Sequence, residues 1–186
     1  TLSMGLAGLL ALAGLLASLA APSLGVRAQS TSVVLDPEAS KVAKGSTTQV
    51  RIFIDGASNL SGVELILVYD QRLLEVVDAD AATSGVQVGL GPLLNPIEAD
   101  VNLVYPGVGQ IEFSQTAAGP AVTNSGVVAV ITFRGLADGV APVTFTTAKL
   151  FDASARLIPA SLRHATVPVG LGAAATPSAT PGACAT

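Results

Sequence analysis

The sequence predicts an all-β fold, a jelly-roll β-sandwich of about nine strands. Three observations between residues 29 and 169 indicate it. Apolar residues recur there in short runs with a period of two, as in strands that bury one face. Val, Ile, Thr and Phe fill these runs, and these residue types suit a pleated surface. Turn-forming pairs separate the runs, and no long helical pattern lies among them.

The predicted strands follow one another closely along the chain. In order they are Ser32–Leu35, Thr48–Asp55, Val63–Tyr69, Leu73–Val77, Val86–Leu90, Val101–Tyr105, Gln110–Ser114, Val127–Phe133, Val143–Thr147 and Ala165–Val169. The alternation is clearest in Gln110–Ser114, where Ile111 and Phe113 share one face. Pairs such as Lys44-Gly45 and Pro106-Gly107 mark the turns between strands.

An apolar segment precedes the predicted sandwich. Residues 4–21 carry no charge and are mostly Leu and Ala, which is typical of a secretion signal. We expect cleavage after Val26-Arg27-Ala28, so that residues 1–28 form a signal peptide. The alternative is an uncleaved anchor helix, because the segment is at the short end of a membrane-spanning length. Either way, the sandwich is expected to be extracellular or at the cell surface. We expect contact with a membrane only through this segment, if it is not cleaved.

The C-terminal residues 170–186 have a different composition. They contain no charged residue and consist mainly of Ala, Thr, Pro and Gly. Such a segment buries too little apolar surface to offset its ordering entropy, so we predict a disordered linker or tail. Cys184 lies in it and is either an attachment point or an incidental thiol.

Charge and composition exclude several functions. The net charge is −4, with 9 basic and 13 acidic residues, so no basic stripe is present to bind nucleic acid. With one Cys and one His, the chain cannot build a zinc site or an internal disulfide. We predict no cofactor and no metal site.

The sequence also offers little for catalysis. No G-x-S-x-G motif is present, and the single imidazole, His164, is interpreted as a loop residue. A glycosidase needs two carboxylates across a cleft, and the candidates are Glu64, Asp70, Asp78, Asp80 and Glu98. Asp78-Ala79-Asp80 is like the start of a calcium loop but lacks the Gly and distal Glu that complete one. We therefore predict that the protein is not an enzyme.

Two blocks of the middle region are similar to a known family. The first is Ser61–Asp78, which reads SGVELILVYDQRLLEVVD, and the second is Gly126–Phe133 followed by Val143-Thr144-Phe145. This pattern resembles the cohesin domains of bacterial extracellular polysaccharide-degrading systems. The resemblance covers roughly Ser32 to Val169. It implies a non-catalytic jelly-roll module whose sheet face binds a dockerin, a calcium-loaded helical module on a partner protein.

Strand phase suggests which residues would form that face. If Tyr69 points inward, Leu65 and Leu67 lie in the core, and Glu64, Ile66 and Val68 point outward. An outward row with two β-branched apolar residues is typical of a protein-binding face, although a covering loop would explain it equally well. On the neighbouring strand, Glu112 and Ser114 point outward and could join the face.

The chain also departs from the family pattern. Acidic residues that often follow the Gln110–Ser114 strand and precede the last strand are replaced by Ala117 and Pro159. These departures bear on which dockerin is bound more than on the fold.

Two other functions stay open. Direct polysaccharide binding would need exposed aromatic rings, but Trp is absent and Phe53, Phe113, Phe133 and Phe145 are expected in the core. Tyr105 alone is expected to be exposed. A structural or adhesin spacer is the other alternative.

Overall fold

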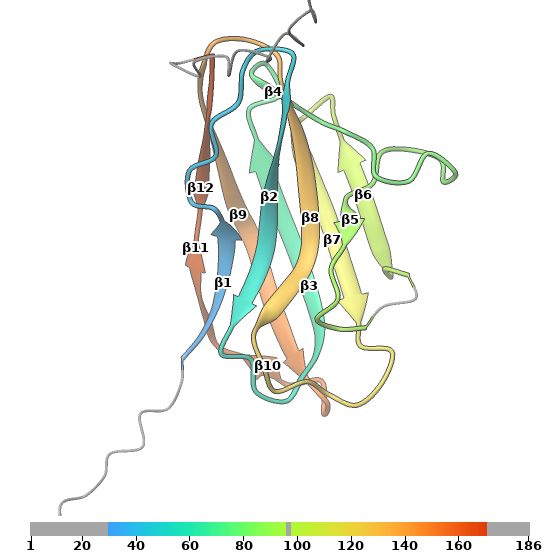
Figure 1. Cartoon of the computed structure of the whole chain (residues 1–186). Coiled ribbons are helices and arrows are strands. Elements are labelled where there is room, and N and C mark those ends of the chain that lie inside the picture. Colours follow the sequence, from blue (N-terminus) through green and yellow to red (C-terminus); the bar gives the residue numbers. More distant parts are fainter. Residues whose placement is uncertain (1–29, 96–97, 171–186) are drawn as a thin grey trace, which may run out of the picture.

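Two β-sheets make up the part of the protein that the structure describes (Figure 1). The computed structural model describes residues 30–95 and 98–170, and every regular element in this part is a strand. The first sheet contains β11 (Ala160–Arg163), β1 (Thr31–Asp36), β2 (Thr47–Asp55), β8 (Gly126–Gly135), β4 (Leu74–Val76) and β5 (Gly89–Leu90). The second sheet contains β10 (Leu157–Ile158), β9 (Gly139–Asp152), β3 (Leu60–Tyr69), β7 (Gln110–Thr116), β6 (Val101–Tyr105) and β12 (Ala165–Val169).

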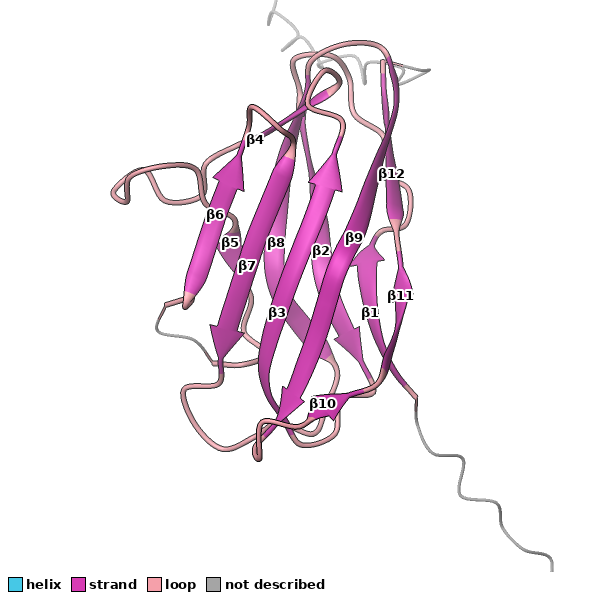
Figure 2. Cartoon of the chain, turned by 180° about the vertical axis from the view of Figure 1, so that it is seen from behind, coloured by secondary structure: helices cyan, strands magenta, loops and turns pink. Residues whose placement is uncertain are grey.

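The sheets pack face to face, with the second sheet in front in Figure 2. All strand pairs are antiparallel except β1 with β11. The predicted jelly-roll β-sandwich is confirmed. The described residues form twelve strands rather than about nine, because the structure adds short strands such as β10 and β11 that the apolar periodicity does not mark.

The core follows from alternation along the two central strands. In β2, Val50, Ile52 and Ile54 are fully buried, whereas the residues between them are exposed or half-buried. In β3, Leu65 and Leu67 are fully buried. Each sheet therefore turns one apolar face inward, and burial of these faces is the main force that stabilises the sandwich.

An aromatic pair joins the two layers. Tyr69 at the end of β3 lies against Phe133 of β8, with ring centroids 5.4 Å apart and planes inclined by 60°. This tilted arrangement suits the quadrupoles of two rings. Burial and the nearby Glu75 carboxylate raise the pKa of Tyr69, so its hydroxyl stays neutral. The inward orientation that the sequence predicts for Tyr69 is thereby confirmed.

One predicted core residue lies elsewhere. Phe53 was expected inside, but β2 points Gln49, Arg51 and Phe53 to the outer face of the first sheet. The three consecutive apolar residues Ile52, Phe53 and Ile54 hide the strand phase, which the flanking polar residues define. Phe53 is half-buried there.

His164 lies where the chain passes from the first sheet to the second, between β11 and β12. Its ring is exposed, and its Nδ1 accepts the backbone N–H of Phe145 at 3.2 Å. The single imidazole is thus a loop residue, as predicted, and it also ties the crossover to β9.

The predicted signal or anchor helix, residues 1–28, and the tail with Cys184 lie outside the described residues. The domain boundaries therefore stay a prediction. Within residues 30–95 and 98–170, no helix has the length and apolarity needed to cross a membrane.

Candidate partner-binding face

The outer face of the second sheet is built around β3. Glu64, Ile66 and Val68 point outward and are half-buried, while Leu65 and Leu67 between them are fully buried. The predicted strand phase is correct. The outward row therefore has two β-branched apolar side chains, an unusual composition for a sheet face in contact with water.

Strand register brings the residues predicted on β3 and β7 together. Glu64 pairs with Ser114, and Ile66 pairs with Glu112. Glu112 and Ser114 are half-buried, and they alternate with the buried Ile111 and Phe113. All five residues that the sequence singled out thus lie on one face.

The edge strand β6 adds three apolar side chains; the exposure of Tyr105 was predicted from the sequence, but that of Val101 and Leu103 was missed. Val101, Leu103 and Tyr105 are 37%, 41% and 40% exposed, and they pair with Ser114, Glu112 and Gln110 of β7. These exposures show that no described loop covers this part of the sheet. Large apolar side chains left open to solvent in this way are typical of a binding surface.

The pattern of β6 is inverted relative to an ordinary edge strand. Its inward Asn102 donates to the Val88 carbonyl at 2.8 Å and accepts the Val88 N–H at 2.9 Å. At this inward position, where an apolar side chain would be usual, the Asn102 amide instead binds the backbone of the segment that contains Val88. The inward Val104 fixes the strand phase and could have revealed the outward row from the sequence.

The three rows define the face. We call it the docking face: Glu64, Ser114 and Val101 in one row, Ile66, Glu112 and Leu103 in the next, Val68, Gln110 and Tyr105 in the third. Cross-strand neighbours are about 5 Å apart, so the face offers contiguous apolar and acidic side chains.

A bulge in β9 adds a cation to this face. Ile66 pairs with Thr147 and Leu67 with Phe145, so Thr146 is the extra residue in β9. One extra residue reverses the alternation of the strand beyond it. Lys149 therefore points outward beside Glu64, and its Nζ lies 2.8 Å from Glu64 Oε1.

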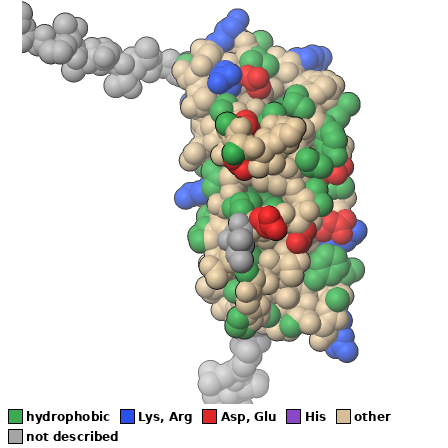
Figure 3. Space-filling model, turned by 90° about the vertical axis from the view of Figure 1, so that its right-hand side faces the viewer, with side chains coloured by type: hydrophobic (Ala, Val, Ile, Leu, Met, Phe, Trp, Pro, Cys, Tyr) green, Lys and Arg blue, Asp and Glu red, His purple; other side chains and the backbone are tan. Residues whose placement is uncertain are grey.

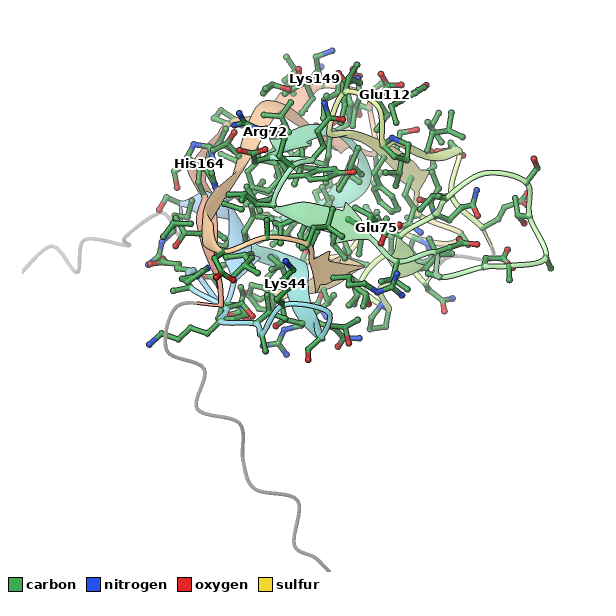
Figure 4. All side chains as sticks on the ribbon, turned by 90° about the horizontal axis from the view of Figure 1, so that it is seen from above. Lys44, Arg72, Glu75, Glu112, Lys149 and His164 are labelled. Atoms are coloured by element: carbon green, nitrogen blue, oxygen red, sulfur yellow. The ribbon has the colours of Figure 1, made fainter. Side chains whose placement is uncertain are left out.

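Glu112 has a different environment. Its Oε1 accepts a hydrogen bond from Gln110 Nε2 at 2.7 Å, and its Oε2 accepts one from the Tyr105 hydroxyl at 3.4 Å. Both donors are neutral. Figure 4 shows Glu112 and Lys149 on the same side of the sandwich, but Lys149 is paired with Glu64.

An open groove lies at the end of the face where β3 begins and β7 ends. Ile66 and Val101 contribute apolar lining. The lining also includes the four carboxylates of Glu64, Asp100, Glu112 and Asp152. Figure 3 shows hydrophobic and acidic side chains next to one another on the side of the sandwich that carries β6. The groove thus combines apolar surface with negative charge.

Two of the carboxylates named as glycosidase candidates, Asp70 and Asp80, make contacts that stabilise turns. Asp70 pairs with Arg72 in the turn after β3, and Asp80 accepts from Ala82 N–H and Thr83 Oγ1. These hydrogen bonds lower the pKa of Asp80. Across the described segments, no three His, Cys, Asp or Glu side chains gather as a metal site would require.

The fold and this face define a class of protein: a jelly-roll β-sandwich with an apolar and acidic outer sheet face. A family model for the cohesin domain matches residues 33–158. This chain therefore belongs to the cohesin family. No curated protein sequence matches it.

Solved structures share the fold. A type II cohesin domain from the cellulosome of Acetivibrio cellulolyticus is 22% identical, with a TM-score of 0.64 over 76% of this chain and 96% of that one. A type I cohesin–dockerin complex from Clostridium thermocellum is 21% identical, with a TM-score of 0.63 over 76% and 94%. A non-cellulosomal cohesin from the archaeon Archaeoglobus fulgidus is 20% identical, with a TM-score of 0.60 over 75% and 91%.

Proposed function

We propose that this protein is an exported, non-catalytic receptor that recruits a dockerin-bearing partner through the docking face. The observation that carries the proposal is the exposed apolar surface of β6 beside the outward Ile66 and Val68 of β3. Contiguous apolar surface of this kind marks a protein-binding site, because a partner that covers it removes it from water.

The comparisons support this choice of partner. The Clostridium thermocellum structure is a cohesin–dockerin complex, and a further neighbour from Acetivibrio cellulolyticus is a type II cohesin–X-dockerin complex. We expect the dockerin to carry calcium on its own side of the interface. The setting would be polysaccharide degradation or assembly at the cell surface, although the archaeal neighbour is a non-cellulosomal cohesin.

Binding of calcium-dependent partners tests the proposal. The tagged chain is incubated with exported proteins of its source organism, in calcium and in chelator, and captured proteins are identified by mass spectrometry. We expect capture of a protein with a duplicated calcium loop, in calcium only. Ile66→Lys should abolish capture, because it places a charge in the apolar row. Gln49→Lys, on the exposed outer face of the first sheet, is the matched control and should bind normally.

Direct polysaccharide binding is the second candidate, favoured only by the exposed ring of Tyr105. A sugar-stacking platform gains from flat aromatic surface, and Tyr105 supplies one ring. Affinity electrophoresis on cellulose, xylan and chitin would support this candidate if retardation were seen and were lost in Tyr105→Ala. No retardation on any of the three would favour the docking function or a spacer without a ligand.

A further inference from the structure

We propose that Glu112 anchors a cationic side chain of the partner, a Lys or Arg that is flanked by apolar residues. This inference rests on the proposed function and specifies the chemistry of the partner. It starts from the position of Glu112 within the docking face. Glu112 pairs with Ile66 on one side and with Leu103 on the other, so a carboxylate stands in the middle of an apolar row.

The charge balance of the face singles out this carboxylate. Glu64 is matched by Lys149, with 2.8 Å between the charged atoms. Glu112 has only neutral donors, and in the described part of the chain it takes part in no ion pair. The centre of the face therefore carries an uncompensated negative charge.

The groove beside Glu112 adds charge of the same sign. Asp100 accepts the Thr116 hydroxyl at 2.8 Å, and Asp152 accepts backbone N–H groups of Ser154 and Arg156 at 2.8 and 2.9 Å. These contacts satisfy lone pairs without neutralising charge. A positively charged partner is thus favoured on approach as well as at the centre of the face.

Desolvation makes a cation necessary rather than merely favourable. In the free protein, water solvates the half-buried carboxylate. A partner that covered Ile66 and Leu103 would also take Glu112 out of water, and a buried carboxylate without a counter-charge is strongly unfavourable. A complementary partner therefore presents apolar groups to Ile66 and Leu103 and a cation to Glu112.

The carboxylate is also preorganised. Gln110 and Tyr105 each donate to a different oxygen, which fixes the rotamer before binding. Each carboxylate oxygen has two lone pairs, so both remain able to accept from a Lys ammonium or an Arg fork. Little side-chain entropy is then lost when the partner arrives.

The test uses the calcium-dependent dockerin that the wild-type chain captures. Its Kd is measured by calorimetry at low and high salt with wild type, Glu112→Gln and Glu75→Gln. Glu75 pairs with Arg134 in the first sheet, so its neutralisation changes net charge equally but away from the face. We expect Glu112→Gln to weaken binding about tenfold or more and to reduce the salt dependence. Glu75→Gln should leave both unchanged.

A second arm identifies the cation. The dockerin surface that contacts the chain is first mapped by its slower hydrogen exchange in the complex. Each Lys and Arg on that surface is then replaced by Met in turn. One replacement should weaken binding as Glu112→Gln does, and the two changes together should cost no more than either alone. If wild type binds and Glu112→Gln leaves the Kd and the salt dependence unchanged, this inference is wrong and the proposed function stands. If wild type captures no calcium-dependent dockerin, the proposed function itself fails and the inference with it.

Discussion

Glu64 on β3 and Lys149 on β9 form an ion pair, with 2.8 Å between Oε1 and Nζ. The pair exists because the bulge at Thr146 turns Lys149 to the outer side of the sheet. Within the docking face, this contact compensates the charge of Glu64 and leaves that of Glu112 uncompensated. The bulge thereby decides which carboxylate of the docking face lacks a counter-charge.

The ion pair itself should stabilise the fold only slightly. Both side chains are about half exposed, at 43% for Glu64 and 47% for Lys149, so solvent and salt screen the attraction. A double-mutant cycle with Glu64→Gln and Lys149→Gln should give a coupling free energy of about 0.2–1 kcal/mol in chemical unfolding. A coupling above about 2 kcal/mol would mean that the pair is a major structural contact.

Gly109 should be essential to the hairpin between β6 and β7. Its φ is +65°, and a Cβ at this position would lie 2.3 Å from the Tyr69 carbonyl oxygen. Gly109→Ala is therefore expected to lower the free energy of unfolding by about 1–3 kcal/mol or more. Gly107→Ala in the same turn is the control, because nothing lies within 4 Å of its Cβ. Equal unfolding midpoints for the two variants would contradict the geometry described for this turn.

The two phenylalanines Phe133 and Phe53 should differ sharply. Phe133 is fully buried between the sheets and packs on Tyr69. Phe133→Ala removes a core ring and leaves a cavity, which typically costs about 3–5 kcal/mol. Phe53→Ala, on the outer face of the first sheet, should cost less than about 2 kcal/mol. Urea unfolding of both variants measures the difference, and a larger loss for Phe53→Ala would place that ring in the core after all.

Protonation of Asp70, in the turn after β3, should lower the free energy of unfolding in acid. Hydrogen bonds from the Arg72 side chain and backbone, with the guanidinium charge, lower the pKa of Asp70 from 3.8 to about 2. A lowered pKa in the folded state gives stability that is present above the ordinary value and lost as the pH falls from about 4 to 2. Asp70→Asn has no such carboxylate. Wild type should therefore lose more of its unfolding free energy over this range than Asp70→Asn, and parallel pH profiles would contradict the prediction.

Alternation along the strands made much of the docking face predictable. Ile66 and Val68 could be placed outward because Leu65, Leu67 and Tyr69 share the opposite phase, and a strand has only two faces. Glu112 could be placed with them by the same reasoning on β7.

Other features depend on tertiary structure that alternation does not encode. Extending the phase of Val143 and Phe145 along β9 would put Lys149 inside, and only the bulge reverses this orientation. The pairing of Tyr105 with Gln110 brings the exposed row of β6 beside β7, and it depends on the hairpin register.

The most direct test of the central claim is a hydrogen-exchange footprint of the chain bound to the dockerin that it captures in calcium. The account predicts slower exchange in β3, β6 and β7, with β1 and β2 unchanged, and loss of this protection in Ile66→Lys. Protection confined to the first sheet, or to the end turns of the sandwich, would contradict it.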